Sequence, residues 1–159
     1  MKWALTNSTF LILFAVGLTS CRTIEEKSLA PKKMTQAEYA TADSDGDGKL
    51  TKEEAATYLH REALAEFDLD DDSQISKKEW AAARPSAGED DPAFQALDQD
   101  GDGQVTEEEA VEFLLENEAF LDPFEKLDTN DDDNLLWEEI EAGDSALFQM
   151  PFLLASKES

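Results

Sequence analysis

Oxygen-bearing side chains recur in this chain at a spacing suited to the binding of a hard cation. Four twelve-residue segments begin at residues 43, 68, 98 and 128, and each has an acid or amide at positions 1, 3 and 5 and a glutamate at position 12. These side chains are Asp43, Asp45, Asp47 and Glu54; Asp68, Asp70, Asp72 and Glu79; Asp98, Asp100, Asp102 and Glu109; and Asp128, Asn130, Asp132 and Glu139. Carboxylates at this density repel one another when no cation lies between them.

Calcium is the cation that this set of oxygens fits. It takes about six to eight oxygen ligands, and a loop of about twelve residues supplies them from positions 1, 3, 5, 7, 9 and 12. Position 7 contributes its backbone carbonyl, and its occupants in the four segments are Lys49, Gln74, Gln104 and Asn134. Position 6 requires a sharp turn with positive φ, which glycine adopts without steric cost. Gly48 and Gly103 stand at that position in the first and third segments.

The four segments resemble the calcium-binding loops of the EF-hand family. The resemblance implies an all-α fold of helix–loop–helix repeats that holds up to four Ca²⁺ ions, with the loops grouped in two paired lobes. In that family the eighth residue of a loop joins a short antiparallel β-bridge to the partner loop. Here this residue is apolar in all four loops, as Leu50, Ile75, Val105 and Leu135.

Two of the loops depart from the family pattern. Loop 2 has Ser73 at position 6, and loop 4 has Asp133 there and Leu136 at position 9. A non-glycine residue at positive φ costs about 1–2 kcal/mol, although aspartate tolerates that conformation better than serine. Leu136 cannot orient a bound water. We therefore expect loops 1 and 3 to bind calcium most tightly and loop 4 to be the weakest site.

The segments between the loops favour helix and predict two units of two loops each. The units span residues 35–84 and 92–155, and Pro85, Gly88 and Pro92 interrupt helix between them. Two helix starts are marked locally, because Thr35 with Glu38 forms a capping box and Asp122 precedes a proline suited to a first helical position.

The pairing of loop 1 with loop 2 raises a geometric difficulty. Residues 55–67 contain no glycine or proline, and a continuous helix there would hold the two loops about 20 Å apart. Either the helix breaks near His60, or loop 1 pairs with a different loop. A break is the favoured alternative, because Leu50 and Ile75 otherwise lack an obvious partner. His60, the only histidine, is expected to be solvated.

The N-terminal residues predict export and lipid attachment. Residues 1–20 contain one charge and a short apolar run from Phe10 to Leu18, which is typical of a secretory signal peptide. The sequence Leu-Thr-Ser-Cys that ends at Cys21 resembles the lipobox of bacterial lipoproteins, in which the cysteine carries the lipid. Residues 21–34 are then the lipidated cysteine and a flexible tether. The expected location is extracytoplasmic, on the periplasmic side of a membrane or on the cell surface; the other interpretation is an ordinary signal peptide.

Charge and motif content limit the classes of function that we expect for this chain. The formal net charge of −25 makes nucleic acid an implausible ligand. We expect no enzymatic activity, because the acidic pairs serve as metal ligands and no nucleophile or phosphate-binding motif remains. Calcium would then be mainly structural or buffering. The alternatives are a calcium sensor that binds a protein partner through an apolar groove, and an adhesion module. The apolar segment 146–155 either packs on its own C-terminal unit or detaches and competes with a partner.

Overall fold

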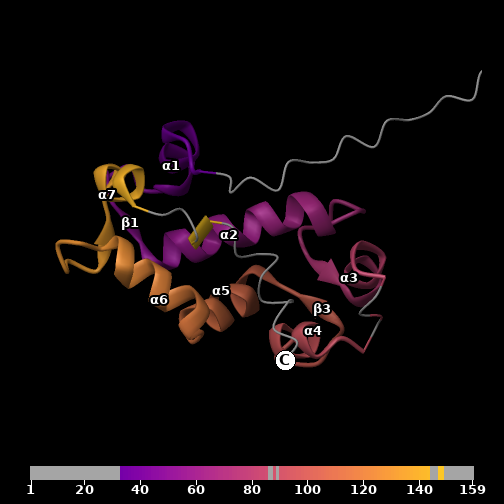
Figure 1. Cartoon of the computed structure of the whole chain (residues 1–159). Coiled ribbons are helices and arrows are strands. Elements are labelled where there is room, and N and C mark those ends of the chain that lie inside the picture. Colours follow the sequence, from indigo (N-terminus) through magenta and orange to yellow (C-terminus); the bar gives the residue numbers. More distant parts are fainter. Residues whose placement is uncertain (1–32, 86–87, 89, 144–146, 149–159) are drawn as a thin grey trace, which may run out of the picture.

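The computed structural model of the chain confirms the all-α fold with short β-bridges (Figure 1). It describes residues 33–85, 88, 90–143 and 147–148. The helices are α1 (Gln36–Ala42), α2 (Lys52–Phe67), α3 (Lys77–Ala83), α4 (Pro92–Leu97), α5 (Glu107–Leu115), α6 (Glu118–Leu127) and α7 (Trp137–Ala142). The strands are β1 (Leu50–Thr51), β2 (Ile75–Ser76), β3 (Gln104–Val105) and β4 (Asn134–Leu135).

Side-chain caps fix where several of the helices begin. The predicted capping box at Thr35 and Glu38 opens α1. The same box recurs at the start of α2, α3 and α5, where the residue at loop position 9 caps the helix and the glutamate at position 12 completes the box. Each of these three glutamates therefore has a structural role at the first turn of a helix in addition to its predicted role as a ligand.

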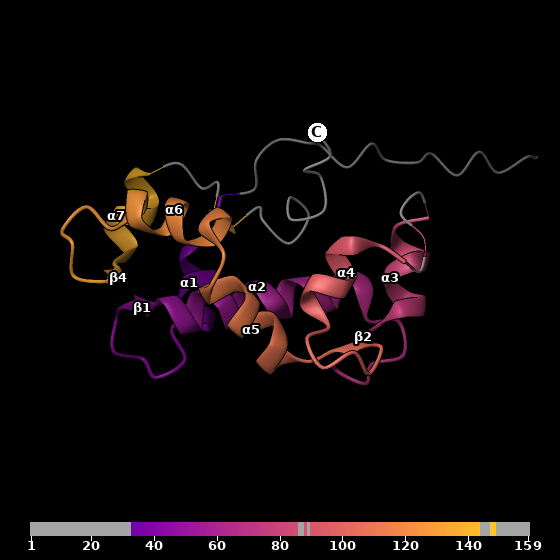
Figure 2. The same ribbon diagram turned by 90° about the horizontal axis from the view of Figure 1, so that it is seen from below.

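The helix between loops 1 and 2 is continuous, so the expected break near His60 is wrong. α2 runs for 16 residues from Lys52 to Phe67, a length of about 24 Å. Its residues favour helix throughout, and its buried side chains contact core residues at both ends of the molecule. Loops 1 and 2 consequently lie at opposite ends of α2 and do not meet (Figure 2).

The loops pair in a different order from the one predicted. β1 of loop 1 is antiparallel to β4 of loop 4, with Leu50 opposite Leu135. β2 of loop 2 is antiparallel to β3 of loop 3, with Ile75 opposite Val105. The favoured pairing of loop 1 with loop 2, and with it that of loop 3 with loop 4, is therefore wrong, and the alternative in which loop 1 pairs with a different loop is confirmed. The apolar residues at position 8 do join β-bridges, as predicted.

The physical reason is that both inter-loop connections are long helical segments that lie side by side. α2 joins loops 1 and 2, and α5 with α6 joins loops 3 and 4 through a turn at residues 116–117. α2 packs along α5. Each end of this central layer therefore brings together one loop from each half of the chain (Figure 2).

Two apolar cores follow from this arrangement. The first lies at the end that carries loops 1 and 4, and its fully buried side chains include Leu50, Phe120, Phe124 and Leu135. The second lies at the end that carries loops 2 and 3, where the Trp80 ring stacks on Phe67 at 5.1 Å and meets Phe94 edge-on at 5.8 Å between ring centroids.

Two local expectations are also wrong. α6 begins after Asn117, whose side chain accepts a hydrogen bond from the Ala119 amide, so Pro123 lies inside the helix and not at its first position. His60 is only 3% exposed, because it lies on the face of α2 that packs against α5. In both cases a tertiary contact outweighs the local sequence preference.

The residues that carry the export and lipidation predictions lie outside the described part of the chain. This holds for the signal peptide at 1–20, for Cys21 and for most of the tether. Among the residues that the structure describes, no helix has the length and apolar character needed to cross a membrane.

Candidate metal centres

The glutamate at position 12 reaches across its loop in the same way in all four segments. In loop 1, Glu54 Oε1 accepts a hydrogen bond from the Ser44 amide at 2.8 Å, and its Oε2 accepts one from the Thr51 amide at 3.1 Å. The equivalent amides at positions 2 and 9 bond to Glu79, Glu109 and Glu139 at 2.7–3.0 Å. Each carboxylate is thus held at the loop interior by hydrogen bonds from the loop itself.

The aspartates at positions 1 and 5 are oriented by the loop backbone. The position 6 amide donates to the position 1 carboxylate in every loop, for example from Gly48 to Asp43 at 2.9 Å and from Asp133 to Asp128 at 2.8 Å. The position 7 amide donates to the carboxylate at position 5, for example from Lys49 to Asp47 at 2.8 Å. Each of these aspartates keeps a second lone pair or oxygen for a cation.

Two positions in each loop adopt the left-handed conformation. Position 6 does so as predicted, with φ of 85° at Gly48 and 68° at Ser73. Position 4 does so as well, which the sequence analysis missed. It is Gly46 in loop 1 and Gly101 in loop 3, with φ of 73° and 74°, but Asp71 and Asp131 in loops 2 and 4. The repeated glycine at position 4 was the signal that could have identified this requirement.

Three of the loops bring three carboxylates together. Carboxylate oxygens from positions 1, 3 and 12 lie within 4.8 Å of one another in loops 1, 2 and 3. The residues are Asp43, Asp45 and Glu54; Asp68, Asp70 and Glu79; and Asp98, Asp100 and Glu109. No such group of acids occurs in loop 4 within the described chain, where Asn130 occupies position 3.

One oxygen in loop 3 tests directly whether these residues fit a cation. Asp98 Oδ1 is buried and has no hydrogen-bond partner in the described structure. Buried carboxylate oxygens are rarely left unpaired, because burial without a partner destabilises the charged group. A Ca²⁺ ion bound by Asp98, Asp100 and Glu109 would supply the missing partner, so the donor set fits this ion.

The titration of the loop acids reflects two opposing effects. Burial alone would raise the pKa of Glu109, but hydrogen bonds from Thr106, Asp100 and Gln99 outweigh burial and lower it. In loop 2, repulsion from Asp72, with smaller contributions from Glu79 and Asp68, raises the pKa of Asp70. The glutamates are thus kept ionised, whereas repulsion among neighbouring carboxylates favours the protonated form of Asp70.

Loop 4 is partly neutralised by two lysines that come from loop 1 and the start of α2. Lys49 Nζ lies 3.0 Å from Asp132 Oδ2, and Lys52 Nζ lies 2.7 Å from Asp133 Oδ1. The hydrogen bond from Lys49 lowers the pKa of Asp132. Tyr39 also joins the two loops, with its hydroxyl 2.8 Å from the Gly48 carbonyl oxygen and 3.0 Å from that of Leu135. Burial, followed by repulsion from nearby acids, raises the pKa of Tyr39 to about 12.

Comparison with known proteins agrees with this geometry in two regions. The family model described as EF hand matches residues 40–54 and 90–114, which contain loops 1 and 3. None of the curated proteins compared with the chain matches it. The two matches and the all-α fold support the EF-hand family, and the matched loops are the two that carry glycine at positions 4 and 6.

Replacement of Ser73 by glycine is expected to strengthen loop 2. Ser73 has a φ of 68°, a conformation that costs a side-chain-bearing residue about 1–2 kcal/mol relative to glycine. Ser73→Gly should therefore tighten calcium binding at loop 2 by about five- to thirtyfold. The matched control is Gly103→Ser in loop 3, which should weaken that site by a similar factor. Calorimetric titration of both variants measures the changes, and a loss of affinity in Ser73→Gly would contradict this explanation.

Proposed function

We propose that this chain is an exported calcium-binding protein that holds up to four Ca²⁺ ions in its EF-hand loops. In this proposal the ions mainly stabilise the fold and buffer calcium, and the protein is attached to a bacterial membrane through a lipid on Cys21. The bound ion would supply the positive charge that the clustered carboxylates lack. Calcium outside the cytoplasm would keep even the weaker sites occupied.

The observation that carries the calcium proposal is the repeated position of the glutamate at position 12. In each loop its two oxygens are fixed by amides at positions 2 and 9. In loops 1, 2 and 3 one of its oxygens also lies within 4.8 Å of carboxylate oxygens at positions 1 and 3. A carboxylate fixed in this way can offer both oxygens to one cation, which suits the large coordination shell of calcium.

Substitution of this glutamate tests the proposal. Glu109→Gln replaces two charged oxygens by one neutral carbonyl oxygen, so the affinity of loop 3 should fall by at least tenfold. Glu54→Gln should have the same effect in loop 1, whereas Glu139→Gln should remove little of the total affinity, because loop 4 is the weakest site. Glu108→Gln is the matched control, since it removes the same charge from an adjacent exposed residue. Calorimetric titration of these variants ranks the sites, and equal losses in Glu109→Gln and Glu108→Gln would contradict the proposal.

The lipid anchor is tested by replacement of Cys21. Cys21→Ala removes the thiol that would carry the lipid, and Cys21 is the only cysteine in the chain. The variant is expected to lose labelling by a radioactive fatty acid and to leave the membrane fraction, because durable anchoring requires the acyl chains. If Cys21→Ala remains membrane-bound and is processed normally, the anchor proposal fails.

A calcium sensor is the second candidate function, and an apolar pocket in the second core favours it. Trp80 forms part of the pocket wall and is 4% exposed. A sensor would expose this region to a partner when calcium binds, whereas a structural protein would keep it closed. Quenching of the Trp80 fluorescence by acrylamide, with and without calcium in a Trp137→Phe background, distinguishes the two functions. Greater quenching in calcium would support the sensor.

A further inference from the structure

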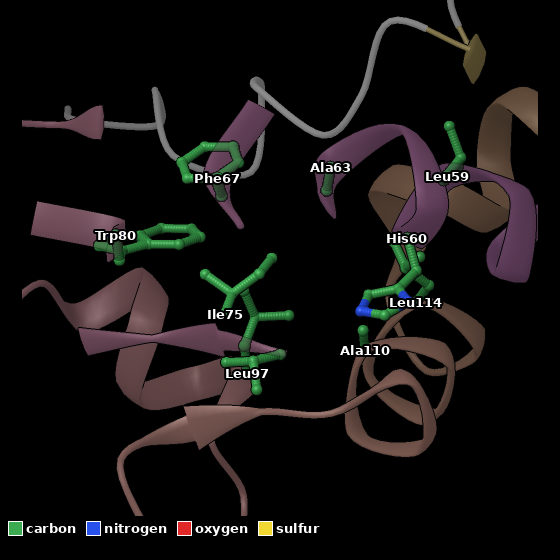
Figure 3. Close-up of a pocket in the computed structure, with 10 residues that line it drawn as sticks. Leu59, His60, Ala63, Phe67, Ile75, Trp80, Leu97, Ala110 and Leu114 are labelled. Atoms are coloured by element: carbon green, nitrogen blue, oxygen red, sulfur yellow. The ribbon is translucent and has the colours of Figure 1, made fainter. Parts of the chain in front are cut away.

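A small apolar pocket opens between α2 and α5 at the edge of the second core (Figure 3). Its walls include Ala63 and Phe67 of α2, Ile75 of β2, Trp80 of α3 and Leu97 of α4. The cavity volume is about 50 Å³. Since one water needs roughly 10–15 Å³ on this measure, the pocket has space for a few waters or for the tip of one bulky side chain.

Among the described residues of the pocket wall, His60 has ring nitrogens that lack a hydrogen-bond partner. Neither ring nitrogen is paired within the described part of the chain, although His60 is only 3% exposed. The nearest acid, Glu107 on α5, lies 3.9 Å from Nδ1, which is too far for a hydrogen bond. Figure 3 shows the ring beside Ala110 and Leu114, with a nitrogen facing the open space of the pocket.

These features define the chemistry of a group that would fit the pocket. It must bring an apolar side chain to fill the cavity and a hydrogen-bonding group to meet a neutral imidazole, which has one donor and one acceptor. A peptide segment offers both, because every residue except proline carries a backbone donor and an acceptor. A long acyl chain does not fit, because the cavity is small and the chain has no polar group along its length.

The chain itself provides such a segment close to the pocket. Leu147 is fully buried in the first core, and the Phe148 ring meets Tyr58 edge-on with 6.1 Å between centroids. Figure 1 shows residues 147–148, in yellow, beside α2. Tyr58 directly precedes Leu59, where the pocket wall begins. The uncharged residues 149–155, Gln-Met-Pro-Phe-Leu-Leu-Ala, follow Phe148 in the sequence.

The length of this segment is sufficient to fill the pocket. The wall formed by α2 extends from Leu59 to Phe67, a distance of about 12 Å along the helix axis. Seven extended residues reach up to about 23 Å. Phe152, four residues beyond Phe148, can therefore reach the middle of the pocket.

We propose that residues 149–155 occupy this pocket, with the Phe152 ring filling the cavity and a backbone amide of the segment bonded to His60. In this proposal the segment covers the contact between α2 and α5 on the side of the second core. The surface that a sensor would offer to a partner is occupied by the protein's own chain, which agrees with a structural role for calcium.

Nuclear magnetic resonance of the full chain in calcium tests the proposal, because His60 is the only histidine and gives a single ring signal. We expect nuclear Overhauser contacts from the His60 and Trp80 rings to Phe152 or Leu153. Phe152→Asp should abolish these contacts. It should also shift the titration midpoint of His60 upward by at least about half a pH unit, because burial holds the pKa of His60 below its ordinary value and release of the segment admits water.

Two further variants make the test specific. Ser156→Asp adds the same charge just beyond the segment and should change none of these signals. Ala63→Leu fills the cavity from the α2 side and should abolish the contacts with Phe152 while that between Phe148 and Tyr58 remains. Unchanged His60 and Trp80 signals in both Phe152→Asp and Ala63→Leu would overturn the proposal. Contacts that occur between differently labelled copies would also overturn it, because they would identify a second molecule as the occupant.

Discussion

Removal of calcium is expected to lower the melting temperature of this protein more than any single substitution on its surface. A site whose Kd is one hundredfold below the free calcium concentration adds about 2.7 kcal/mol to the free energy of unfolding. Two such sites, loops 1 and 3, add roughly 5 kcal/mol, which corresponds to a rise in Tm of roughly 15–20 °C. Relief of repulsion among the loop aspartates contributes in the same direction.

Magnesium should reproduce little of this effect. It requires an octahedral shell at about 2.0–2.1 Å and loses its waters reluctantly, so a loop that offers a bidentate glutamate fits it poorly. Thermal unfolding in calcium, in magnesium and in chelator, at equal ionic strength, measures the differences. Equal melting temperatures in calcium and in chelator would contradict the calcium proposal, and equal values in calcium and magnesium would contradict the assignment of the ion.

Truncation of Leu50 is expected to destabilise the first core and to weaken loop 4 together with loop 1. Leu50 is fully buried and lies opposite Leu135 in the bridge between these loops. Leu50→Ala should lower the free energy of unfolding by about 3 kcal/mol, because it removes buried methyl groups and leaves a cavity. The loss of packing at the bridge should also lower the calcium affinity of both paired loops, while loops 2 and 3 retain theirs.

The fluorescence of the two tryptophans in the described chain reports on the two pairs of loops separately. Trp137 packs against Tyr39 beside loops 1 and 4, and Trp80 lies in the core of loops 2 and 3. In Leu50→Ala the calcium dependence of Trp137 fluorescence should move to higher concentration, and that of Trp80 should not move. Leu69→Ala is the control, because Leu69 is 67% exposed. A shift in the signal of Trp80 without one in that of Trp137 would indicate that loop 1 pairs with loop 2 after all.

The grouping of carboxylates within loops 1, 2 and 3 could be predicted from the sequence because it depends on local spacing. Twelve consecutive residues determine where Asp43, Asp45 and Glu54 lie relative to one another, and nothing from the rest of the chain is needed. The β-bridge residues could be found for the same reason. The second role of the glutamate at position 12, as part of a helix cap, is equally local but was not inferred.

The pairing of the loops could not be read in this way, because it depends on the packing of α2 against α5. The sequence of α2 does favour an unbroken helix, but the assumption that neighbouring loops pair outweighed that signal. The burial of His60 follows from the same packing, since a lone polar residue on a helix carries no local sign of its partner. The position of Pro123 inside α6 is a further tertiary effect, in which burial of Phe120 and Phe124 outweighs the helix-start signal at Asp122.

A crystal structure of the protein grown in millimolar calcium tests the central claim most directly, because it locates each ion and each pair of loops at once. We expect anomalous scattering from an ion in loops 1 and 3 at least, each bound by about seven oxygens at roughly 2.3–2.6 Å. Asp98 Oδ1 should be among the ligands in loop 3, and Leu50 should lie opposite Leu135. Loops without ions at that calcium concentration, or ions bound elsewhere on the acidic surface, would contradict the account.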